Sequence, residues 1–174
     1  MGSEMCIRDS LGRRRGSGPA DGAPRAEPAV VARAAAARGD VAAVTSRETF
    51  EYAVLRVVPR VERGESFNAG VLVYCRQRDY LGSRVHLDVD RLRALDPTAD
   101  PRAIAAALQA SADVCAAAPG VGAAGREALG SRFRWLTAPR STVVQPGPVH
   151  TGLTGDPDAE ADRLLQLLVL PVRA

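Results

Sequence analysis

Residues 50–75 read FEYAVLRVVPRVERGESFNAGVLVYC, and this stretch decides the fold. It contains two segments rich in Val, Leu and Tyr, Tyr52–Val58 and Gly70–Cys75, whose composition suits a half-buried pleated surface. Pro59 ends the first segment, because proline has no backbone N–H to donate to a strand ladder. The stretch therefore predicts two β-strands joined by a polar loop of about a dozen residues, which is longer than a simple turn needs.

A third strand is predicted over Tyr80–Leu87, where apolar and polar residues alternate. Leu81 and Val85 share one face of this strand, and Arg84 and His86 share the other. The connections between the three strands are consistent with an antiparallel meander. A short fourth strand is predicted at Thr142–Gln145, because two prolines and a glycine interrupt the residues that follow it.

Helices follow the meander, and most of them begin at an aspartate that can cap the first turn. Two of these aspartates precede a proline, which suits the first helical position. The predicted helices begin at Asp88 or Asp90, at Asp100-Pro101, near Arg126 and at Asp156-Pro157. The sequence therefore predicts an α+β fold, in which three to four helices cover one face of a small antiparallel sheet.

The first 46 residues differ in composition from the rest, so we expect a tail over 1–46 and one α+β domain over 47–174. The opening MGSEMCIRDS resembles translated read-through of a sequencing adapter, and the Gly-, Pro- and Arg-rich residues after it favour disorder. We expect the authentic start near Val44. A helix is predicted over Glu27–Arg38, and it would be marginally stable alone.

The composition argues against several classes of function. All 23 basic residues are arginine, and the net charge is only +3, so the sequence shows no concentrated basic face for nucleic acid. The three cysteines lack zinc-ligand spacing, and we expect Cys75 and Cys115 to be reduced, buried thiols in a cytoplasmic protein. No apolar stretch is long enough to span a membrane, and no signal peptide, metal or cofactor is indicated.

The loop after the first strand carries the first set of candidate ligand- or partner-binding residues. Glu62 and Glu65 are paired carboxylates that suit acid–base chemistry or a hard cation. Arg60 and Arg63 lie beside them, so a solvated charged loop is the competing interpretation. Asn68 has a second interpretation too, since asparagine tolerates unusual backbone angles.

The second set lies in residues 138–152, APRSTVVQPGPVHTG. A planar guanidinium with neighbouring hydroxyls can hold a phosphate or a carboxylate, and a histidine can transfer a proton. The same side chains can instead satisfy loop backbone groups. The candidates in this set are Arg140, Ser141, Thr142, Gln145, His150 and Thr151. We expect this loop and the loop over Arg60–Asn68 to meet at one end of the sheet, and we expect Trp135 to be buried.

Four blocks, in this order, carry a resemblance to a known family. They are YAVLRVVPRVERGESFNAGVLVYC, LDVDRLRALDP, FRWLTAPRSTVVQPGPVHTG and the final helix that begins with Asp-Pro. The chain resembles, over about residues 50–170, a bacterial family catalogued as domain of unknown function 3037. The resemblance implies a small bacterial protein whose genes often neighbour HipA-like kinases. It implies no catalytic residues, and Gly147 stands where the resemblance implies a serine.

Two functions of different classes follow. The first is an accessory protein-interaction module, for which the resemblance implies a HipA-like kinase as partner. The alternative is an enzyme or ligand-binding protein that handles a phosphorylated or acidic small molecule through the APRST…PVHTG loop. An exposed apolar surface would favour the first, and a pocket lined by Arg140 and His150 would favour the second.

Overall fold

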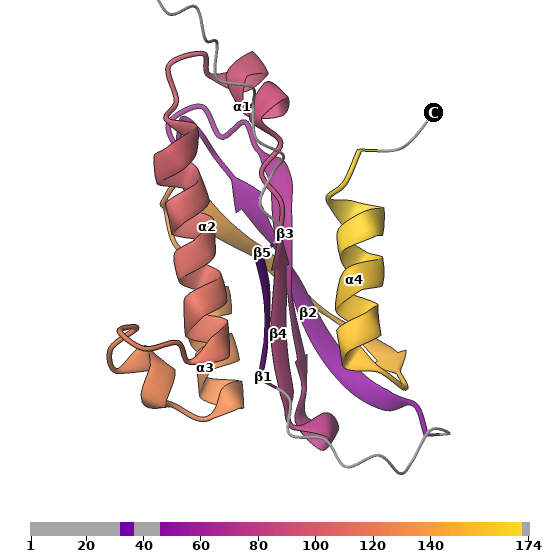
Figure 1. Cartoon of the computed structure of the whole chain (residues 1–174). Helices are drawn as coiled ribbons and strands as arrows, with labels where there is room; N and C mark the ends of the chain where they lie inside the picture. The colour runs from indigo at the N-terminus through magenta and orange to yellow at the C-terminus, as the bar shows by residue number, and fades with distance from the viewer. Residues whose placement is uncertain (1–31, 37–45, 172–174) are drawn as a thin grey trace, which may run out of the picture.

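The computed structural model describes residues 32–36 and 46–171, and its central element there is a five-stranded antiparallel sheet (Figure 1). The strands lie in the order β1-β4-β3-β2-β5. Their bounds are Ala32–Ala36 (β1), Glu48–Val57 (β2), Phe67–Cys75 (β3), Tyr80–Val85 (β4) and Val144–Thr154 (β5). β2, β3 and β4 form the predicted meander, and β5 pairs with the outer side of β2.

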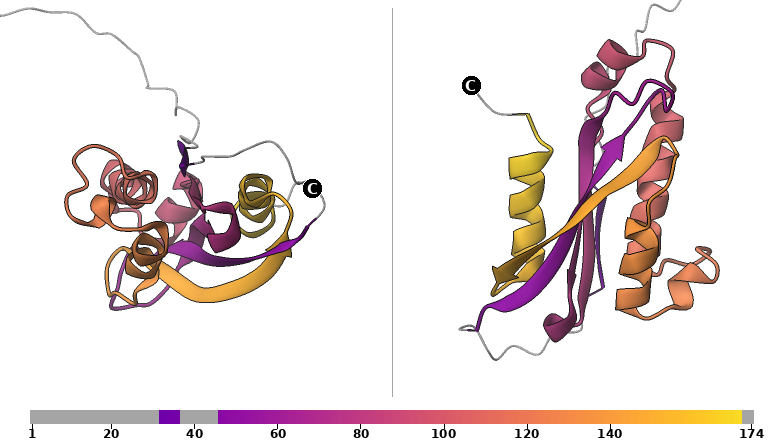
Figure 2. Two further views of the ribbon diagram at one scale, coloured as in Figure 1. Left: turned by 90° about the horizontal axis from the view of Figure 1, so that it is seen from below. Right: turned by 180° about the vertical axis from the view of Figure 1, so that it is seen from behind.

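Within the described residues, four α-helices pack around this sheet. They are α1 (Val89–Leu95), α2 (Pro101–Ala116), α3 (Leu129–Thr137) and α4 (Pro157–Leu168). α2 and α3 lie on one face of the sheet and α4 lies on the other (Figures 1 and 2). The predicted α+β class is confirmed. The expectation that helices cover one face is wrong, because the apolar stripe of α4 packs on the second face.

The aspartates predicted to start helices act as caps. Asp88 accepts a hydrogen bond from the backbone N–H of Arg91 at 3.0 Å, and Asp100 accepts one from Arg102 at 2.9 Å. Asp156 accepts from the first turn of α4 in the same way. These bonds satisfy backbone donors that have no partner within the helix, which is why the sequence signal for helix starts is dependable here.

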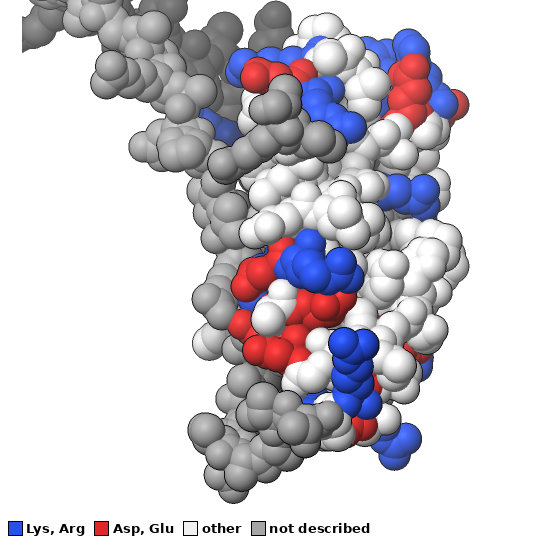
Figure 3. Space-filling view, turned by 90° about the vertical axis from the view of Figure 1, so that its right-hand side faces the viewer, with Lys and Arg blue, Asp and Glu red and all other residues white. Residues whose placement is uncertain are grey.

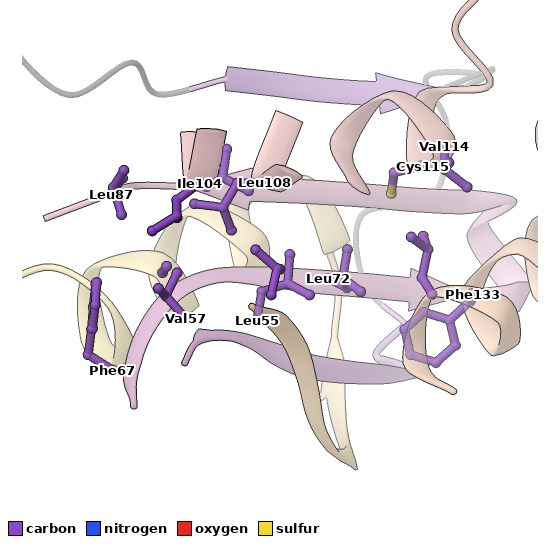
Figure 4. Packing of buried hydrophobic residues seen from close by; sticks show 14 of the residues in the cluster. Leu55, Val57, Phe67, Leu72, Leu87, Ile104, Leu108, Val114, Cys115 and Phe133 are labelled. Carbon is purple, nitrogen blue, oxygen red and sulfur yellow. The ribbon is translucent and has the colours of Figure 1, made fainter. Parts of the chain in front are cut away.

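Each face of the sheet has its own apolar core. The α2–α3 core is shown in Figure 4 and includes Leu55, Leu72, Ile104, Leu108 and Phe133. The α4 core lies on the opposite face and includes Phe50, Val71, Tyr80, Leu164 and Leu165. Alternate residues of one strand therefore enter different cores, as the period of two requires. On β4, Leu81 and Val85 enter the α2–α3 core and Arg84 contacts α4, which confirms the predicted faces.

β1 corrects one local prediction. The sequence predicts a helix over Glu27–Arg38, whereas Ala32–Ala36 forms a strand that pairs antiparallel with β4. The edge of β4 offers backbone N–H and C=O groups, and pairing with them replaces the internal hydrogen bonds of a marginal helix. The rest of the predicted tail, residues 1–31 and 37–45, lies outside the described residues.

β5 corrects a second prediction, since it is longer than expected. The predicted strand ended at Gln145, but β5 has 11 residues and continues through Pro146 and Pro148. Proline is tolerated in an edge strand, because a missing N–H that would point to solvent costs no ladder bond. The register of β5 on β2 also shifts between Ala53 and Leu55, opposite the proline segment.

Cys75 and Cys115 are buried and free, as predicted, and Cys6 lies outside the described residues. None of the helices in the described part of the chain is long and apolar enough to cross a membrane.

Candidate functional site

The loop between β2 and β3 is tied to the residues that follow α1. Arg60 Nε lies 3.3 Å from the Oδ2 of Asp96, which is 6% exposed. The hydroxyl and the backbone N–H of Thr98 also donate to Asp96, at 2.7 and 3.0 Å. These bonds from Thr98, with the help of Arg60, lower the pKa of Asp96 to about 2. Arg60 therefore holds the loop in place, and its charge is already matched.

The other candidates of this loop are spread over different surroundings. Arg63 Nε lies 2.9 Å from Glu65 Oε2, and both side chains are well exposed, so this ion pair contributes little stability. Glu62 is exposed. Asn68 lies in β3, where its Nδ2 donates to the backbone oxygen of Leu168 at 2.8 Å. Asn68 thus joins β3 to the end of α4.

Arg140 closes the C-terminal end of α3. Its guanidinium donates to the backbone oxygens of Trp135, Leu136 and Ala138. It also stacks on the Trp135 ring, with 4.8 Å between the guanidinium carbon and the ring centroid. A cation at this end of a helix is favourable, because it satisfies carbonyl groups that lack partners. The planar fork predicted to hold an anion is therefore used within the chain.

Trp135 itself is 50% exposed, so the prediction that it is buried is wrong. Phe133 and Leu136 occupy the inward positions of α3 and are 0% and 2% exposed. With 3.6 residues per turn, a residue between these two points away from the core. Because Phe133 and Leu136 take the inward positions of α3, Trp135 must face outward. Helical periodicity in the sequence could have predicted this exposure.

The two candidate loops do lie at the same end of the sheet. The backbone N–H of Val58 donates to the oxygen of Val143 at 2.8 Å, which brings the residues after β2 next to those before β5. Ser141 and Thr142 belong to this end and are exposed. The Thr142 hydroxyl donates to the backbone oxygen of Val144 at 2.7 Å, so it shapes the start of β5.

The remaining candidates lie farther along the chain, within β5: Gln145, His150 and Thr151. His150 is opposite Tyr52, and the two ring centroids are 5.1 Å apart. Asn68 is opposite Arg56. Arg56 and Tyr52 are four positions apart on β2, which corresponds to about 13 Å along the strand. The structure therefore brings the two loops together but leaves His150 and Thr151 outside that group.

Sequence reasoning missed an ion pair between the sheet and α3. Both terminal nitrogens of Arg134 donate to the two carboxylate oxygens of Glu51, at 3.0 and 2.9 Å. This bidentate geometry is the strong form of an arginine–carboxylate contact. Although Arg134 lies within the FRWLTAPRSTVVQPGPVHTG block, the two residues are far apart in the sequence, and no local signal links them. Thr151 lies opposite Glu51 on β5 and lines a hollow with both residues.

The outer edge of β5 is the other feature that stands out. β5 is the last strand of the sheet in the described part of the chain, and its 11 residues include no Asp, Glu, Lys or Arg. Two of its apolar side chains point outward, since Val149 is 39% exposed and Leu153 is 61% exposed. An open strand edge and uncharged side chains together can accept another polypeptide strand.

Comparison with known proteins identifies the family. A family model described as "Protein of unknown function (DUF3037)" matches residues 52–169, from within β2 to the end of α4. No curated protein and no solved structure matches the chain. The match covers more than half of the chain, and the resemblance noted in the sequence is confirmed. The chain belongs to the DUF3037 family.

Proposed function

We propose that this protein is an accessory interaction module that binds an extended segment of another protein along the open edge of β5. The observation that carries this proposal is the position of β5, which pairs with β2 on one side and, among residues 32–36 and 46–171, has no strand on the other. Figure 2 shows β5 running along the outside of the sheet, in front of it when seen from behind. Such an edge offers a row of backbone donors and acceptors, and many domains bind peptides by adding a strand there.

The second half of β5 lacks the features that usually protect an edge. Natural edge strands are commonly shielded by charged residues, prolines or bulges. In β5 the prolines, Pro146 and Pro148, lie only in the first half of the strand, and charged residues are absent throughout. The second half, from Val149 to Thr154, therefore stays available for pairing. We infer that it forms the docking segment.

The surrounding surface supports binding of a protein. In Figure 3 acidic and basic side chains gather over the lower part of α4, and a broad uncharged area extends beside and above them. On another part of the surface, Trp135 is half exposed and carries the Arg140 guanidinium on its ring. Tryptophan and arginine contribute strongly to binding at protein interfaces. Both features favour a protein partner over a purely structural role.

A HipA-like kinase is the partner that we propose, on the basis of the family resemblance. A shared cytoplasmic location is part of this proposal, since such a partner and this chain must meet in one compartment. An extended segment of the kinase would form backbone hydrogen bonds with Val149–Thr154. Its apolar side chains would contact Val149 and Leu153.

The test uses purified full-length chain and a HipA-like kinase from the same genome. Titration calorimetry should detect binding to the wild type, and Leu153→Lys should weaken it at least tenfold. Leu167→Lys is the matched control, because Leu167 is 65% exposed on α4 and lies outside β5. Absence of binding to the wild type would reject the kinase as partner. Equal effects of both variants would reject β5 as the docking strand.

The alternative, a small-molecule site in the APRST…PVHTG loop, has less support. Arg140 is the cation on which that site depended, and its guanidinium donates to three backbone oxygens. His150 lies within β5, away from Ser141 and Thr142. A ligand at this loop would have to displace Arg140 from the end of α3 before the guanidinium could bind it.

A further inference from the structure

A polar hollow of about 560 Å³ opens on the α2–α3 face of the sheet, at the end where β3 turns into β4. Its floor comes from β2, β3 and β5, and its walls come from α3 and from the short 3₁₀ helix η1 (Arg76–Arg78). The polar groups on which the argument below depends are Thr49, Glu51, Arg76, Ser131, Arg134 and Thr151. Its volume lies within the range of small-molecule sites, about 300–1,000 Å³.

The charges in this hollow favour an anion. Arg134 is held by Glu51 in the bidentate ion pair, which neutralises one charge of each sign. Arg76 is exposed, and its guanidinium makes no hydrogen bond or ion pair within residues 32–36 and 46–171. Two guanidinium groups against one carboxylate leave the lining with a net positive charge. The free guanidinium is therefore the group that a ligand would contact first.

Hydroxyl groups surround this charge. Thr49, Ser131 and Thr151 come from β2, α3 and β5, and each side chain is exposed to the hollow without a hydrogen bond to another described residue. Each hydroxyl can donate one hydrogen bond to an oxygen atom of a ligand. Donors from three separate elements converge here, whereas Glu51 is already engaged by Arg134.

The first turn of α3 is held close to the hollow. A Cβ atom added at Gly130 would lie 2.9 Å from the hydroxyl oxygen of Tyr74, so the turn packs against Tyr74 as closely as glycine allows. Ala128 supplies no side-chain cap to the N-terminus of α3. The positive end of the helix therefore adds to the favourable electrostatics set by the arginines.

We propose that this hollow binds the phosphoryl group of a small phosphorylated molecule. A phosphoryl group presents three acceptor oxygens with one to two negative charges, which match the fork of Arg76 and the surrounding hydroxyls. The volume exceeds that of a phosphate ion, so an organic part of the ligand also has room. The hollow shares Thr151 with the docking segment of β5, but it uses the hydroxyl of Thr151 and not the backbone edge of the strand, and it does not require a protein partner.

Titration calorimetry on the full chain, at constant ionic strength, tests this proposal. The probes are ribose 5-phosphate, AMP and inorganic phosphate, with ribose and adenosine as unphosphorylated counterparts. We expect at least one phosphorylated probe to bind while its counterpart does not, and Arg76→Gln to weaken that binding at least tenfold. The matched control is Arg93→Gln, an exposed arginine on α1 at the opposite end of the molecule, which should leave the affinity unchanged.

Amide spectra by NMR then locate the bound probe. The proposal requires shifts at Gly130, Ser131 and Thr151 in the wild type, and loss of those shifts in Arg76→Gln. Shifts confined to Ser141 and Thr142 would overturn it, since they would place the anion at the other loop. Equal weakening by Arg76→Gln and Arg93→Gln, or no binding of any probe at millimolar concentration, would also overturn it.

Discussion

Arg84 and Asp162 join β4, an inner strand of the sheet, to α4, since Arg84 Nε lies 2.5 Å from Asp162 Oδ1 and the Arg84 side chain is 0% exposed. Asp158 completes the arrangement, because its Oδ1 accepts from Arg84 Nη2 at 2.9 Å and from the Tyr80 hydroxyl at 3.0 Å. A buried guanidinium needs such partners to offset the loss of hydration. These contacts fix where α4 sits on the sheet.

We expect Asp162→Ala to destabilise the fold by about 2–3 kcal/mol, because it removes one carboxylate from a buried arginine. Arg84→Met should cost less, since it removes the buried charge itself and fills much of the space. Urea unfolding of each variant measures the change. The control is Glu160→Gln, which breaks a surface pair with Arg163 on the same helix and should change stability by about 0.5 kcal/mol or less. If Asp162→Ala and Glu160→Gln cost the same, the buried arginine does not depend on Asp162.

We expect the folded protein to lose stability in acid because of Asp96. Its pKa in the folded chain is about 2, below the ordinary value of 3.8, because Thr98 and Arg60 favour the carboxylate. The folded state therefore binds a proton less readily than the unfolded state, and the stabilisation is present above about pH 4. It is lost as the pH falls from about 4 to 2. Urea midpoints should drop less across this interval in Asp96→Asn than in the wild type, and parallel curves would contradict the assignment.

Trp135 and Phe133 should respond differently to truncation. Trp135→Ala should cost about 1 kcal/mol or less, because the ring is half exposed and its main contact is Arg140. Phe133→Ala should cost about 3–5 kcal/mol, since this ring is fully buried in the α2–α3 core. Thermal melts compare the two variants. Fluorescence of the wild type gives an independent check, because an exposed tryptophan emits at long wavelength, and blue-shifted emission would contradict the exposure.

The thiol of Cys115 should be inert in the folded protein. Burial raises its pKa to about 12, and a thiol must lose its proton to react. In a Cys6→Ser variant at pH 8, a thiol reagent should therefore label Cys115 only as fast as the protein opens. Labelling should become rapid in denaturant. Fast labelling of Cys115 under native conditions, located by mass spectrometry, would show that the residue is accessible.

Much of the fold was predictable because local chemistry specified it. The strands of the meander follow from runs of β-branched and aromatic residues, and the capping aspartates at 88, 100 and 156 mark three helix starts. For β5 the sequence predicts too short a strand, because prolines such as Pro146 and Pro148 normally end one. Whether a proline interrupts a ladder depends on whether the strand lies at an edge, and that position is a property of the whole sheet.

The candidate site was less predictable for the same reason. The residues around Arg140 are of the types that bind anions. Its guanidinium nevertheless donates hydrogen bonds to the backbone carbonyls at the end of α3. No residue pattern in the sequence marks these carbonyls, apart from the signals that predict where the helix ends. The pairing of Glu51 with Arg134 is likewise set by how α3 packs on the sheet. Side-chain types limit what a residue can bind, and tertiary packing decides what it does bind.

The pairing of β2 with β5 has a consequence for synthesis on the ribosome. Glu48 pairs with Thr154 and Val57 with Val144, so everything from β3 to α3 is made before β2 gains its second neighbour. Throughout that interval the outer edge of β2 is unpaired and can associate with strands of other nascent chains. Contacts so distant in sequence also close slowly. A chaperone that covers the β2 edge until residue 154 has emerged would therefore raise the yield of folded protein.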